Sequence, residues 1–142
     1  MENEQERPIT FFRFEDLRIY HKALEYTETI YSMSRNAKDD PYTRYFFERF
    51  LTSATSIATN IAEGSSRNKS QFVYYLKMAK SSVRECVVLS TLALNQKFVS
   101  AEVFDNSKNY LMEMTKMIGA LIGSLQRSVR PEEPGSDDGD ND

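Results

Sequence analysis

Three polar residues near the middle of this 142-residue chain have the types and spacing that could do chemistry. Ser56, Asn60 and Glu63 fall at i, i+4 and i+7, so on a helix they share one face. A hydroxyl, an amide and a carboxylate can form a hydrogen-bond network, or an acid–base site if a base or nucleophile stands beside them. No such group accompanies them in the sequence, so we predict a structural polar motif and no catalytic residues. With its downstream partners, the motif comprises Ser56, Asn60, Glu63, Gly64, Ser82 and Glu85.

Two members of this polar motif need partners of their own. Glu63 stands in the last turn of its predicted helix, where a carboxylate opposes the negative end of the helix dipole. We expect Glu63 either to cap the helix that follows or to pair with Arg67. Asn60 lies beside apolar residues, and we expect its side chain to bond across to a neighbouring helix.

Other chemistries lack the residues they require. The chain has one histidine, His21, whereas a paired-metal site in a helix bundle draws on Glu-x-x-His motifs. It has one cysteine, Cys86, and this residue falls on an apolar stripe rather than in the exposed electropositive setting that activates a thiol. The sequence contains no glycine-rich phosphate loop, zinc-ligand spacing or nucleophile elbow. We therefore expect no metal, no cofactor and no enzymatic activity.

The elements that must position these residues are helices, because apolar residues recur in steps of three and four and never alternate as in a half-buried strand. Asp40 followed by Pro41 is a typical helix start, and Gly64 is predicted to end the same helix. Asn68, followed by Gln71 three residues later, resembles a capping box and predicts the start of a further helix. Short connections make neighbours antiparallel, so the fold class is an all-α, up-down-up-down four-helix bundle. The predicted helices cover about 15–37, 41–64, 68–93 and 100–128.

Charge divides the chain into a bundle and two ends. Six of the 21 acidic residues lie after Arg130, whereas all 18 basic residues lie at or before it. We predict a flexible N-terminal arm at 1–12, the bundle at 13–130 and a disordered acidic tail at 131–142. The chain has no apolar run long enough to cross a membrane and no secretory signal pattern, so we expect a soluble cytoplasmic protein without membrane contact.

Basic residues concentrate in the third predicted helix and the turn before it. Between Gly64 and Ala101, six basic residues face one acid, Glu85. Such a cluster can neutralise phosphates, with Tyr74 and Tyr75 available for base stacking, or it can be an ordinary solvated helix face. The candidate nucleic-acid-binding residues are Arg67, Lys69, Lys77, Lys80 and Arg84.

The helices also carry more aromatic and apolar area than four helices can hide. The residues outside the core stripes are Tyr20, Leu24, Tyr31, Tyr42, Tyr45, Phe47, Tyr74, Tyr75, Val87, Tyr110, Met117 and Ile122. Wide stripes of this kind indicate a second buried face, as self-association would provide, or tyrosines lying half-exposed along the bundle.

The segment Asn60-Ile61-Ala62-Glu63-Gly64, the downstream residues 79–85 and a leading Phe14-Glu15-Asp16-Leu17 resemble the bacterial family of 23S rRNA intervening-sequence proteins. This family is related to the accessory variability determinant of diversity-generating retroelements. The resemblance implies a cytoplasmic bundle that forms a ring-shaped homo-oligomer, a pentamer, without enzymatic activity. It also implies RNA or DNA as a partner and, by analogy with the retroelement relative, a reverse transcriptase or another protein. The leading hypothesis is a nucleic-acid-binding homo-oligomer, and the alternative is a protein-interaction scaffold with no nucleic-acid contact.

Overall fold

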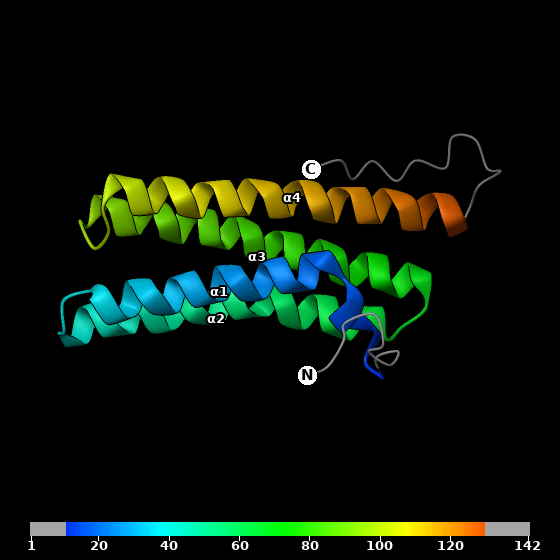
Figure 1. The fold of residues 1–142 in the computed structure, drawn as a ribbon, viewed down its shortest axis with the longest axis horizontal. Helices are drawn as coiled ribbons and strands as arrows, with labels where there is room; N and C mark the ends of the chain where they lie inside the picture. Colours follow the sequence, from blue (N-terminus) through cyan, green and yellow to red (C-terminus); the bar gives the residue numbers. More distant parts are fainter. Residues whose placement is uncertain (1–10, 130–142) are drawn as a thin grey trace, which may run out of the picture.

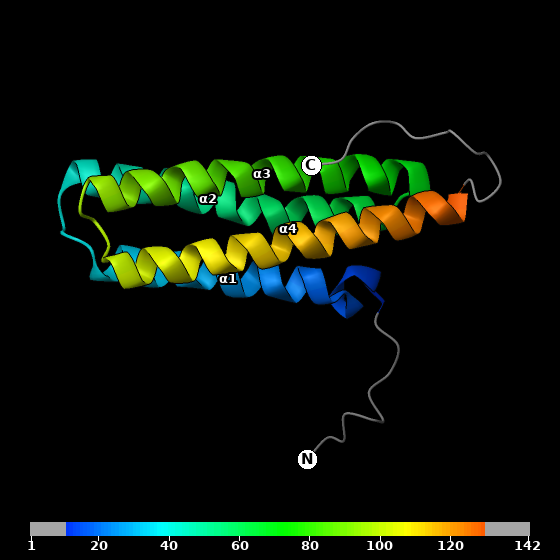
Figure 2. The same ribbon diagram turned by 90° about the horizontal axis from the view of Figure 1, so that it is seen from above.

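The computed structural model describes residues 11–129, and their regular structure is entirely helical. Successive α-helices run in opposite directions along one axis (Figure 1 and Figure 2), which confirms the antiparallel four-helix bundle. Residues 1–10 of the predicted arm and the whole predicted acidic tail lie outside the described residues. The helices are a short 3-10 helix η2 (Arg13–Asp16), α1 (Arg18–Asn36), α2 (Pro41–Ser65), α3 (Lys69–Asn95) and α4 (Ala101–Val129).

Side chains cap three of the α-helices at their first turn. Asp40 Oδ1 accepts a hydrogen bond from the backbone N–H of Thr43 at 2.9 Å, and Asn68 Oδ1 accepts one from Gln71 at 2.9 Å. Ser100 does the same for α4, through the N–H of Val103 at 3.1 Å. Each cap satisfies a donor that has no partner inside its helix, so the starts of α2, α3 and α4 follow from local sequence.

The N-terminal end differs from the prediction, which ran one helix from residue 15 to residue 37. Glu15 and Asp16 belong to η2, and Leu17 adopts an extended conformation with φ −91° and ψ 126° before α1 begins. His21 Nε2 lies 2.7 Å from the carbonyl oxygen of Glu15, so a side-chain contact spans this break.

The four α-helices form a square in cross-section. Within the described residues, α1 and α3 each contact α2 and α4, while the diagonal pairs make no close backbone contacts. The core is one continuous cluster in which all four helices take part, with Ile30, Phe50, Leu76 and Ile118 fully buried. Among neighbouring pairs, α1 and α4 make the fewest backbone contacts.

Gly64 does not end α2, because the helix continues through Ser65 and Ser66 is its C-cap. The glycine instead allows α3 to approach. A Cβ at this position would lie 2.6 Å from Cβ of Tyr75 and 3.0 Å from Cδ1 of Phe72, both on α3. Real Cβ atoms essentially never come within 3.0 Å of another heavy atom, so the spacing of α2 and α3 near their shared turn depends on a residue without a side chain.

Hydroxyl groups join three helices inside the core. Ser107 Oγ on α4 lies 2.8 Å from Tyr26 Oη on α1 and 2.7 Å from Ser90 Oγ on α3. Burial raises the pKa of the Tyr26 phenol, and it raises the pKa of the neighbouring Cys86 thiol to about 12. Every member therefore stays neutral at physiological pH, and a polar network of this kind favours one helix register over others.

Candidate functional site

The predicted polar motif holds α2 and α3 together. Ser56 Oγ lies 2.5 Å from Ser82 Oγ on α3, and one turn away Ser53 Oγ donates to Glu85 Oε1 at 3.1 Å. Both contacts join residues far apart in sequence. The motif thus joins two helices, and Ser53 takes part although the spacing analysis did not select it.

The partners of Asn60 and Glu63 are local. Asn60 Nδ2 donates to the carbonyl oxygen of Ser56 at 2.8 Å within α2, so the expected bond to a neighbouring helix is replaced by a bond four residues back. Glu63 Oε2 accepts from Arg67 Nε at 3.1 Å and also from Arg67 Nη2. Of the two expectations for Glu63, the structure contains the pairing with Arg67. No base or nucleophile is bonded to either side chain.

The five candidate nucleic-acid-binding residues have different surroundings. Arg67 pairs with Glu63, and its guanidinium lies 5.1 Å from the centre of the Tyr75 ring. Lys69 and Arg84 are exposed and Lys77 is half-buried. Lys80 is only 8% exposed, so most of its side chain packs into the bundle rather than forming part of an open surface.

Helical geometry places the basic side chains of α3 away from its acid. Ser82 and Glu85 contact α2. At about 100° per residue, Lys77 and Arg84 project about 140–160° around the helix from Ser82 and about 80–100° from Glu85. Within the described residues α3 packs only against α2 and α4, so Lys77, Lys80 and Arg84 form a basic flank on the α4 side. Glu85, bonded to Ser53, lies off this flank.

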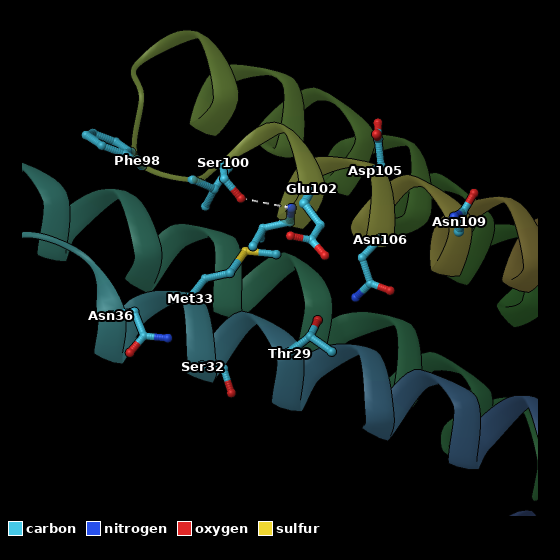
Figure 3. Close-up of a pocket in the computed structure, with 12 residues that line it drawn as sticks. Thr29, Ser32, Met33, Asn36, Phe98, Ser100, Glu102, Asp105, Asn106 and Asn109 are labelled. Atoms are coloured by element: carbon cyan, nitrogen blue, oxygen red, sulfur yellow. Dashed lines mark hydrogen bonds between the residues drawn. The ribbon is translucent and has the colours of Figure 1, made fainter.

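A groove of about 710 Å³ opens between α1 and α4, next to the loop that joins α3 to α4. Glu102, Asn106 and Thr29 point into the space between the two helices (Figure 3). Met33 projects from α1 into the same space, and the dashed line marks the cap in which the N–H of Val103 donates to Ser100 Oγ. Among the described residues, no lysine or arginine lines this groove, so its hydroxyl, amide and carboxylate groups provide no positive charge for a phosphate. The periodicity of the sequence could not predict this groove, because the groove depends on the distance between α1 and α4.

A second pocket of about 500 Å³ lies at the end of the bundle where α2 meets α3. Residues 11–14 form one wall and the last turns of α2 form the other. Phe11 and Phe12 fall within the flexible arm predicted at 1–12, so no role was predicted for them. In the sequence, the only feature that could have drawn attention to Phe11 and Phe12 is composition, since three phenylalanines occur within four residues.

No group of three or more His, Cys, Asp or Glu side chains in residues 11–129 could hold a metal ion. In the same part of the chain, no helix is long and apolar enough to cross a membrane.

These observations define an antiparallel four-helix bundle with a hydroxyl-rich seam between α2 and α3 and a basic flank beside α4. A sequence model of the 23S rRNA-intervening sequence protein family matches residues 15–120, and the chain belongs to this family. The fold is similar to the crystal structure of a protein of unknown function from the S23 ribosomal protein family of Bacteroides thetaiotaomicron. That likeness has a TM-score of 0.68 at 21% identity and covers 74% of this chain and 95% of the other. A comparison with curated proteins found no match.

Proposed function

We propose that the protein is a non-catalytic, homo-oligomeric accessory bundle of the cytoplasm that binds RNA or DNA. The family's description, which refers to intervening sequences of 23S rRNA, supports nucleic acid as the class of partner. A cytoplasmic location agrees with the single free cysteine, Cys86, which is buried and needs no oxidising compartment.

The observation that carries the proposal is the basic flank of α3. Lys77 and Arg84 lie two turns apart, about 10 Å along the helix, and Lys80 lies between them. Phosphates recur along a nucleic-acid strand at a spacing that two such cations can follow. Lys69 stands at the start of the same helix and Arg67 just before it. In this proposal Lys77 and Arg84 make the main phosphate contacts, Lys69 extends the track, and the largely buried Lys80 and the paired Arg67 add positive potential.

The outer face of α3 supports self-association. Tyr74, Met78, Val88 and Leu92 are each at least 42% exposed. With Ser81 and Glu85 between Met78 and Val88, they follow a seam in steps of four and three residues, the spacing with which a further helix packs alongside. We propose that a second copy of the chain covers this face, in the pentameric ring that the family resemblance implies.

The test measures affinity against salt for two charge-reversal variants of equal net charge. Fluorescence anisotropy of a labelled structured RNA, a single-stranded DNA and a duplex DNA is recorded with the full chain at two salt concentrations, and light scattering gives the mass of each variant. Lys77→Glu with Arg84→Glu reverses the basic flank. We expect lower affinity and a salt slope reduced by about 2, since each lost phosphate contact removes about 0.7–0.9 from it.

The matched control reverses two exposed charges, Arg35→Glu in the last turn of α1 and Lys38→Glu in the connection to α2. We expect this variant to keep most of the affinity and the original slope. Equal losses from both double variants would mean that only net charge matters, and the assigned flank would then be wrong.

The second candidate function is a protein-interaction scaffold, favoured by the exposed apolar seam on α3. In that case a protein partner covers Tyr74, Met78, Val88 and Leu92, and the basic residues only keep the surface hydrated. The same variants decide between the two functions. Absence of binding to any of the three nucleic acids by a folded oligomer would favour the scaffold.

A further inference from the structure

We propose that the pocket at the α2–α3 end of the bundle binds an unpaired nucleobase that carries an exocyclic amine, such as cytosine, in single-stranded RNA or DNA. The proposal rests on the function proposed above and adds a second contact region, distinct from the basic flank. It assigns a role to Phe11, Phe12 and Glu63 that phosphate binding does not use.

The aromatic wall of this pocket is unusually exposed. Phe11 is 88% exposed and Phe12 is 54% exposed, whereas phenylalanines normally bury most of their area. Their ring centres lie 5.0 Å apart at 85°, and Phe12 continues to Phe14 at 5.9 Å. Phe14 in turn packs on Tyr20 of α1 at 4.8 Å, so the row is anchored to the bundle at one end. An anchored row of rings with open faces can stack on nucleobases.

The opposite wall offers hydrogen-bond acceptors. Glu63, Ser65 and Ser66 line the pocket from the end of α2. Ser65 Oγ donates its proton to the carbonyl oxygen of Ala62 at 3.0 Å, and Ser66 Oγ donates to that of Glu63 at 2.9 Å. With these donors used inside the helix, both hydroxyls can act toward a ligand only as acceptors, as the Glu63 carboxylate does. Acceptors suit the amine of cytosine or adenine and not the carbonyl that uracil has at the same position.

Charge around the pocket also suits a nucleotide. Arg13 lines it beside the phenylalanines and can meet the phosphate next to a stacked base. Arg67 pairs with Glu63 and offsets the negative charge that would otherwise repel that phosphate. Residues 11–14 and the end of α2, which line the pocket, lie at the same end of the bundle as the start of α3 (Figure 1), so one strand can reach from this pocket toward Lys69.

The test uses three labelled oligonucleotides of equal length and backbone charge: oligocytidine, oligouridine and an abasic strand. Anisotropy titrations use the full chain and the double variant Phe11→Ala with Phe12→Ala. The control, Tyr42→Ala with Tyr45→Ala, removes two aromatics that are 86% and 70% exposed near the start of α2, at the other end of the bundle. We expect oligocytidine to bind at least about 5-fold more tightly than the abasic strand, the lower limit for one base stacked on an aromatic ring.

Each result has a defined meaning. Loss of the cytidine-over-abasic preference in the Phe11/Phe12 variant, but not in the tyrosine control, supports the pocket. Equal binding of cytidine and abasic strands overturns it, because then only phosphates are recognised. Equal binding of oligocytidine and oligouridine overturns the role of Glu63. Absence of binding by all three strands overturns the proposed nucleic-acid function itself.

Discussion

Replacing Gly64 with alanine tests the close approach of α2 and α3 near their shared turn. Alanine has the higher helix propensity, by about 1 kcal/mol in a helix interior. Here its methyl group would stand 2.6 Å from Cβ of Tyr75. Cβ cannot rotate away, so α3 itself must shift, and overpacking of this kind costs about 1–3 kcal/mol. We expect Gly64→Ala to lower the free energy of unfolding by up to about 2 kcal/mol, measured by urea denaturation followed by circular dichroism.

Gly119 on α4 provides the matched control, because a Cβ there would meet nothing within 4 Å. Gly119→Ala keeps the propensity gain without the clash, so we expect it to raise stability by up to about 1 kcal/mol. The difference between the two variants isolates the clash, about 1–3 kcal/mol. If Gly64→Ala proves as stable as Gly119→Ala, the close approach of α2 and α3 does not depend on Gly64 and the reasoning fails.

Two further predictions concern the buried polar groups. Ser107→Ala removes the hydroxyl that joins Tyr26 and Ser90, and we expect the free energy of unfolding to fall by about 1–3 kcal/mol. The control Ser124→Ala, on the exposed side of α4, should change the free energy of unfolding by less than about 0.5 kcal/mol. The pKa of the Cys86 thiol rises from 9.0 to about 12 on burial. Above about pH 9 the unfolded chain therefore loses a proton that the folded chain keeps, so the free energy of unfolding should fall as pH rises from 9 toward 12. Denaturation midpoints measure this fall, and midpoints that do not change over this pH range would contradict the burial of Cys86.

Features that depend on neighbours along the chain were predictable from the sequence. The caps of Asp40 and Asn68 lie three residues from the N–H groups they accept, so residue type and spacing suffice to find them. The pairing of Glu63 with Arg67 is of the same kind, four residues apart, and was one of two expectations. The prediction that Gly64 ends α2 was wrong, because the helix continues through Ser65. The glycine instead allows close packing against α3, which leaves no local signal in the sequence.

Contacts between segments distant in sequence required the structure. The bond that Ser53 makes with Glu85 joins residues 32 positions apart, and the spacing of neither residue specifies the other. The expected bond from Asn60 to a neighbouring helix was wrong, because its amide donates to a carbonyl in its own helix, and the sequence did not decide between these two partners. The burial of Lys80 also escaped the charge pattern, since a lysine on the edge of an apolar stripe can face either solvent or the adjacent helix.

The sequence by itself determined the fold class, the number of α-helices and the starts of α2, α3 and α4, because apolar periodicity and capping are properties of short segments. It also determined that the basic residues of the second half concentrate in and just before α3. Only the tertiary structure decided which of these residues are exposed, how closely α2 and α3 approach at Gly64, and that Phe11 and Phe12 form a pocket with the end of α2. These features depend on distances between helices, and such distances are set by the packing of the whole core rather than by any one segment.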